Sequence, residues 1–96
     1  MTITEPRETA TVEASGRAAI VTKFHGQTNH RPNRITASRA DGGGPRITMS
    51  WNHNVDTMTN HELAVREFLA LMNWGGKWIV GATKSGAVAT WAGPLI

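Results

Sequence analysis

The segment Arg34-Ile-Thr-Ala-Ser-Arg39 is followed by Ala40-Asp-Gly-Gly-Gly-Pro45 and then by Arg46-Ile-Thr-Met-Ser-Trp51. Apolar and polar residues alternate in the first and third of these segments, as in strands that bury one face of a sheet. The glycines between them tolerate the positive φ angles that a reversal of the chain needs. The sequence therefore predicts a β-hairpin over residues 34–51.

Alternation also predicts what each face of this hairpin carries. Arg39 is two positions after Ala37 and four after Ile35, so it can lie on their face of the hairpin, opposite Arg34. The apolar face is expected to carry Ile35, Ala37, Ile47, Met49 and Trp51. The polar and basic face is expected to carry Arg34, Thr36, Ser38, Arg46, Thr48 and Ser50.

The residues after the hairpin predict one amphipathic helix. Thr59-Asn-His-Glu62 has the form of a capping box, and Met58 and Leu63 are spaced as a hydrophobic staple across the first turn. This start places His61 in an exposed first turn, and Gly75-Gly76 is expected to end the helix. The apolar face, which we expect to form part of the core, carries Ala64, Val65, Phe68, Leu69, Leu71 and Met72.

Three further segments have the composition of strands. Residues 20–24 indicate a short strand, and residues 27–33, which are rich in turn formers, indicate a loop. Residues 77–83 and 87–92 indicate two strands joined by a turn at 84–86. The order is β-β-β-α-β-β, which predicts the α+β class. We expect a small antiparallel sheet, or two smaller ones, with the amphipathic helix packed on one face.

The first 17 residues contain almost no large apolar side chains, so burial cannot compensate the entropy lost on ordering them. We expect a flexible arm over residues 1–17 and a single domain over residues 18–96. The chain has no cysteine and no run of the roughly 18 apolar residues that a membrane helix needs. We therefore expect a protein of the reducing cytoplasm with no membrane partner.

The basic residues are unevenly distributed along the chain. Six of the ten lie between Arg17 and Arg46, where Asp41 is the single acid. Such a concentration attracts polyanions, so nucleic acid or a protein that handles it is the expected partner. A basic surface that only promotes solubility is the alternative. The residues expected to contact the partner are Lys23, Asn29, His30, Arg31, Asn33, Arg34, Arg39 and Arg46.

Catalytic signatures are lacking. His25, His30, His53 and His61 do not have the spacing typical of a zinc site, and no nucleophile elbow occurs. The glycines at 42–44 lie between two strands rather than before a helix, so they predict a turn and not a phosphate-binding loop. We expect a protein that is not an enzyme and that needs no metal or cofactor. An enzyme built on the histidines is the third alternative.

The aromatic residues argue against two forms of nucleic-acid binding. Apart from two histidines, Phe24 is the only aromatic residue in the basic segment, whereas single-strand binders usually stack bases on several rings. The predicted helix is close to neutral, so it is a poor reader of the major groove. For the four tryptophans, Trp51, Trp74, Trp78 and Trp91, we expect core positions, although one exposed indole would anchor a protein partner.

Several of these residues together resemble a known group of proteins. The core Thr22-Lys-Phe-x-Gly-x-Thr-Asn-x-Arg31, with Trp51-Asn-His53, Asn60-His61 and Leu71-Met-Asn-Trp74, is similar to a family of small, mostly uncharacterised proteins from phages and mobile elements. The similar part runs from about Val21 to Gly81. The resemblance implies no catalytic residue.

Small phage proteins with an assigned role are often non-enzymatic inhibitors of host defence. The resemblance therefore implies an anti-CRISPR protein in the cytoplasm of an infected or lysogenic bacterial host. Such an inhibitor would use its basic hairpin and loop to bind the protein surface or the guide RNA of a CRISPR effector complex, and would block the path of target DNA. The chain differs from the strongly acidic inhibitors that mimic DNA. The alternative is a phage accessory protein that binds DNA or RNA directly.

Overall fold

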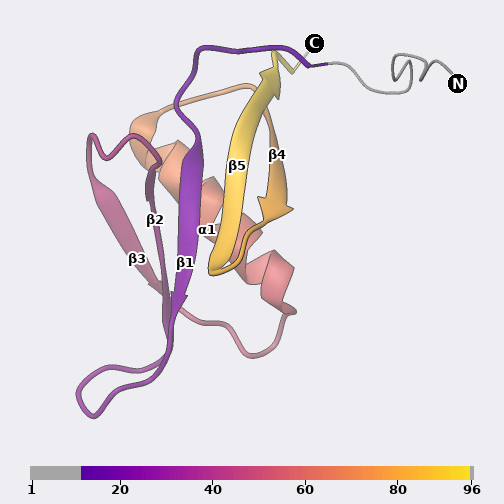
Figure 1. Ribbon diagram of the computed structural model, residues 1–96. Coiled ribbons are helices and arrows are strands. Elements are labelled where there is room, and N and C mark those ends of the chain that lie inside the picture. Colours follow the sequence, from indigo (N-terminus) through magenta and orange to yellow (C-terminus); the bar gives the residue numbers. More distant parts are fainter. Residues whose placement is uncertain (1–11, 96) are drawn as a thin grey trace, which may run out of the picture.

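The computed structural model describes residues 12–95 (Figure 1). Its elements are β1 (Ile20–His25), β2 (Arg34–Arg39), β3 (Arg46–Ser50), α1 (Thr57–Met72), β4 (Lys77–Ala82) and β5 (Gly86–Gly93). The strands form one antiparallel sheet in the order β3-β2-β1-β5-β4, and α1 crosses one face of it. This confirms the α+β class and the predicted order of elements. Of the two arrangements that the sequence allowed, the chain forms the single sheet.

β1 lies at the centre of the sheet. The strands β1, β2 and β3 form a meander. α1 then runs diagonally across one face of the sheet, from beside the β4–β5 turn toward the β2–β3 turn, and the loop after it leads to β4 at the far edge. β5 then returns between β4 and β1, so that residues 20–23 pair with residues 86–89. This seam between β1 and β5 joins the meander to the C-terminal hairpin.

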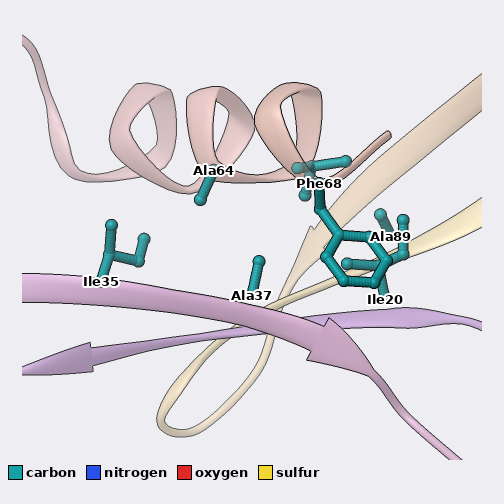
Figure 2. Packing of buried hydrophobic residues seen from close by; sticks show 7 residues of the cluster. Ile20, Ile35, Ala37, Ala64, Phe68 and Ala89 are labelled. Atoms are coloured by element: carbon teal, nitrogen blue, oxygen red, sulfur yellow. The ribbon is translucent and has the colours of Figure 1, made fainter. Parts of the chain in front are cut away.

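The core lies between α1 and the central strands. Figure 2 shows Ala64 and Phe68 pointing from the helix toward the sheet, and Ile35 and Ala37 pointing from β2 toward the helix. The single methyl groups of Ala37 and Ala64 allow the helix to lie close to the sheet, and the ring of Phe68 fills the space beside them. The core side chains that are at most 1% exposed in this view are Ile20, Ile35, Ala37, Ala64, Phe68 and Ala89.

The apolar face of the hairpin follows the predicted alternation. In the β2–β3 register, Ile35 lies opposite Met49, and Ala37 lies opposite Ile47. All four side chains belong to the core or pack against it on the helix side of the sheet. Trp51 packs there too, although it lies one residue beyond the end of β3.

The helix begins and ends earlier than the sequence predicts. Asp56 is the N-cap, and its carboxylate accepts a hydrogen bond of 2.7 Å from the backbone N–H of Thr59. The prediction of Thr59 as the cap is wrong, because an aspartate three residues upstream satisfies the free amide groups of the first turn. The helix stops before the glycines, since Asn73 adopts a left-handed conformation with a φ of 56°. Leu71, predicted on the apolar face, is 55% exposed because it lies outside the stripe that faces the sheet.

Residues 12–19 precede the sheet without forming a helix or strand. The guanidinium carbon of Arg17 lies 4.2 Å from the ring centroid of Trp91 in β5, which is a cation–π contact. The described end of the predicted arm thus touches the sheet. Residues 1–11 of that arm lie outside the described residues.

Candidate nucleic-acid interface

On the face of the sheet opposite α1, alternate residues of β1, β2 and β3 lie in rows. Strand pairing places His25 beside Arg34, and Arg34 beside Ser50, in one row across the three strands. The next two rows are Lys23–Thr36–Thr48 and Val21–Ser38–Arg46. We refer to the polar members of these rows as the basic face, which comprises Lys23, His25, Arg34, Thr36, Ser38, Arg46, Thr48 and Ser50.

The pKa of His25 is sensitive to the positive charge of the basic face. Its Nε2 lies 3.0 Å from Oγ1 of Thr36. Partial burial lowers the pKa of His25, and four neighbouring cations lower it further. These cations are Arg34, Lys23, Arg46 and Arg31. Positive charges from three strands and from the β1–β2 loop therefore act on one point of the sheet.

The cations of the basic face have no carboxylate partner among the described residues. The strands β1, β2 and β3 contain no acidic residue. The ion pairs within residues 12–95 lie elsewhere and join Arg39 to Asp41 and Arg66 to Glu62. An anion that reaches the basic face would meet unneutralised charge together with the hydroxyl groups of its serines and threonines.

Arg39 does not join this face. Alternation puts its side chain on the helix side of β2, where it lies alongside the backbone of Gly44. Its Nη2 donates a hydrogen bond of 2.6 Å to the Asp41 carboxylate. Hydrogen bonds from the N–H of Gly43 and from Arg39 lower the pKa of Asp41, so the pair stays ionised at neutral pH. We therefore separate Arg39 from the other predicted contact residues.

The β1–β2 loop projects beyond one end of the sheet (Figure 1). The Thr28 hydroxyl accepts hydrogen bonds from the N–H groups of His30 and Arg31, at 3.3 and 3.1 Å, and the Thr28 N–H donates to the Arg31 carbonyl. This turn leaves the side chains of Asn29, His30 and Arg31 exposed. Asn33 is half-buried, and its carbonyl accepts a hydrogen bond from the backbone just after β3. Three of the predicted contact residues thus lie on an exposed turn next to the basic face.

His61 is buried, so its prediction as an exposed residue of the first turn is wrong. Because the helix begins at Thr57, His61 lies in the second turn and faces the sheet. It is 2% exposed, and its Nδ1 lies 2.7 Å from Oγ1 of Thr22 in β1. Burial lowers the pKa of His61. The signal in the sequence is Thr22, a hydroxyl at an inward position of β1 that needs a buried polar partner.

Aromatic rings form two clusters on the helix side of the sheet, one of which includes His61. The Trp51 ring meets Phe24 edge to face at a centroid distance of 4.7 Å, and it meets His61 at 5.9 Å. A second pair, Trp74 and Trp78, is stacked with centroids 5.9 Å apart. All four tryptophans are half-buried. Phe24 and Trp51 therefore lie behind the basic face and provide no stacking surface beside its cations.

The part of the chain that the structure describes contains no group of three His, Asp or Glu side chains that could hold a metal ion. None of its helices has the length and apolar character needed to cross a membrane. In comparisons with known proteins, no family model matches the chain, and no curated protein or solved structure matches it significantly. The candidate interface therefore rests on the geometry of the basic face and the β1–β2 loop.

Proposed function

We propose that this chain is a non-enzymatic protein that binds the sugar-phosphate backbone of nucleic acid through the basic face and the β1–β2 loop. The observation that carries the proposal is the placement of Lys23, Arg34 and Arg46 on one face of the sheet, with Arg31 in the loop next to it. These cations come from separate strands and a loop, and they have no carboxylate partner among the described residues. Regularly spaced phosphates are the anions that such an array fits.

The side chains of the basic face favour contact with the backbone over reading of the bases. Lysine, arginine, serine and threonine are the residues that most often bind phosphate and sugar oxygens. Phe24 and Trp51 lie on the helix side, so they cannot form a stacking platform among these cations. We therefore expect binding that tolerates many sequences and depends strongly on salt.

The test is to measure affinity for a duplex and for a single-stranded oligonucleotide between about 50 and 200 mM salt. In a plot of log affinity against log salt, four phosphate contacts predict a slope of about −3.6 for the duplex and about −2.8 for the single strand. Arg34→Glu should weaken binding about tenfold and reduce the slope by about 1. The matched control is Arg66→Glu, which reverses an exposed charge on α1 and should leave binding intact. Binding insensitive to both salt and Arg34→Glu contradicts the proposal.

A second candidate function is inhibition of a CRISPR effector ribonucleoprotein in the cytoplasm of an infected or lysogenic bacterial host. Two observations favour it. Residues 22–31 resemble small phage proteins, and the basic face is complementary in charge to the guide RNA that such a complex holds. The chain would then act by closing the path of target DNA, without chemistry on it.

Purification of the tagged chain from cells that carry a CRISPR effector complex, with and without nuclease, separates the two candidates. Effector subunits that remain bound in stoichiometric amounts after nuclease support the inhibitor. Nucleic acid alone, lost on nuclease treatment, supports the direct binder. Arg34→Glu should reduce recovery in either case, whereas Arg66→Glu should not. A chain that recovers neither partner argues against both.

A further inference from the structure

A pocket opens on the helix side of the sheet, where β1 ends. It lies between the first turn of α1 and the β4–β5 turn. Phe24, Trp51 and Met58 form its apolar wall, and the buried His61 also lines it. Phe24 and Met58 are each 40% exposed, so part of this apolar wall faces solvent. The pocket therefore combines accessible apolar surface with one buried polar group.

The hydrogen bonds around His61 determine which of its ring nitrogens can bind a further group. The Thr22 hydroxyl lies 3.4 Å from the carbonyl of Ala87 and 2.7 Å from Nδ1 of His61. We assign its single hydrogen to the Ala87 carbonyl, and on this assignment its oxygen accepts from Nδ1 of His61, so Nδ1 carries the hydrogen. Burial lowers the pKa of His61, which keeps the ring neutral at pH 7. Nε2 is left as an acceptor to which no residue within 12–95 donates, on a side chain that lines the pocket.

The pocket and the basic face are the two sides of one strand end. Phe24 stands between Lys23 and His25 in β1, and consecutive strand residues point to opposite faces of the sheet. The Cα atom of Phe24 is about 3.8 Å from that of Lys23 and about 3.8 Å from that of His25. The β1–β2 loop with Arg31 leaves from the same end. The residues that line the pocket include Lys84 and no carboxylate, so an anionic molecule meets no repulsion there.

We propose that this pocket accepts one unpaired nucleobase of the nucleic acid whose phosphates lie on the basic face. This inference rests on the proposed function and deepens it, because it makes a strand with an unpaired base the preferred substrate. The planar base stacks on the exposed ring of Phe24 or on the accessible part of the half-buried Trp51 ring, and it donates an N–H to Nε2 of His61. Base and phosphate are thereby held on opposite sides of the same strand.

Adenosine, which has no phosphate, tests the pocket independently of the basic face. In the free chain, the nitrogen NMR signals of His61 should show hydrogen on Nδ1 and none on Nε2. Titration with adenosine should shift the Nε2 signal saturably, together with the ring signals of Phe24 and Trp51. N6,N6-dimethyladenosine lacks the amino hydrogen and should bind at least about threefold more weakly. The opposite tautomer, or no saturable shift with adenosine, overturns the proposal.

Two variants and one alternative probe complete the test. Phe24→Ala should weaken adenosine binding about tenfold through lost stacking. Ile79→Ala removes a side chain that is similarly exposed but lies outside the pocket, and should leave binding unchanged. If N-acetyltryptophanamide binds and adenosine does not, the pocket takes a protein side chain and the proposal is wrong.

These experiments distinguish an error in the pocket proposal from an error in the function proposed for the basic face. Salt-dependent binding of oligonucleotides without an adenosine shift overturns the pocket alone. An adenosine shift without salt-dependent oligonucleotide binding supports the pocket as a site for a base and overturns the function proposed for the basic face.

Discussion

At the scale of single residues, Gly86 determines how closely β5 can pair with β1. A Cβ atom at this position would overlap the carbonyl group of Thr22 on the neighbouring strand, whereas a Cβ at Gly81 would meet no atom within 4 Å. Gly86→Ala should therefore destabilise the fold by about 1–3 kcal/mol, because backbone must move to admit the methyl group. Gly81→Ala should change stability by less than about 0.5 kcal/mol. Urea unfolding followed by tryptophan fluorescence measures both, and equal midpoints would contradict the prediction.

His61 should make stability sensitive to mild acid. Burial lowers its pKa in the folded chain, while in the unfolded chain the group titrates near its ordinary value of about 6.5. Below that pH the unfolded chain binds a proton that the folded chain resists. Stability should therefore be greatest above about pH 6.5 and should fall as the pH drops toward the folded pKa. The pKa of His25 is also lowered and adds an effect of the same sign.

Urea midpoints measured between about pH 7.5 and 5 test this pH dependence. His61→Asn keeps an N–H donor for Thr22 but removes the titrating ring, so its stability should vary less with pH than that of the wild type. His53 is exposed, and His53→Asn should keep the wild-type dependence. A wild-type slope in His61→Asn would show that another group carries the effect.

At the scale of elements, the start of α1 distinguishes the observed cap from the predicted one. Hydrogen bonds from the side chain and backbone N–H of Thr59 lower the pKa of Asp56, so the carboxylate is ionised where it caps the helix. Asp56→Ala should lower the urea midpoint and the helical signal in circular dichroism. Thr57→Ala, a change at the next exposed position, should have little effect. Equal losses in both variants would argue against Asp56 as the cap.

The elements themselves could be predicted from sequence because their signals are local. Alternation in residues 34–51 and helical periodicity after Met58 each depend on neighbours a few positions apart. The helix start could not be placed, because Asp56 and Thr59 are both good caps and only the fold selects between them. The burial of His61 depends on Thr22, which is 39 positions away in the chain.

The candidate site was predictable in its residues and not in its arrangement. Lys23, Arg31, Arg34 and Arg46 stand out in the sequence by charge alone. That Lys23, Arg34 and Arg46 share one face, with Arg31 in the loop beside it, follows only from the register of β1, β2 and β3 and the position of that loop. Parity indicated that Arg39 can lie on the other face, but its pairing with Asp41 requires the geometry of the turn. The pocket beside Phe24 combines residues from β1, α1 and the β4–β5 turn, so no local pattern points to it.

At the scale of the whole molecule, Phe68 belongs to a core shared by the meander, the helix and the C-terminal hairpin. Phe68→Ala should therefore cost about 3–5 kcal/mol and weaken every element together. Leu71→Ala, one helical turn away but 55% exposed, should cost less than about 0.5 kcal/mol. Circular dichroism and tryptophan fluorescence should give coincident unfolding curves in both variants. Separate transitions for helix and sheet would contradict a shared core.

The seam between β1 and β5 also determines when the molecule can finish folding. Thr22 and Ala87 meet across this seam although 65 positions separate them in the chain. The meander, the C-terminal hairpin and the helix can form early from nearby residues, but closing so long a loop is slow. During synthesis, the inner edge of β1 stays unpaired until residues 86–89 have left the ribosome. Completion of this sheet therefore waits for β5 to be synthesised, and until then β1 is the edge most prone to pair with another chain.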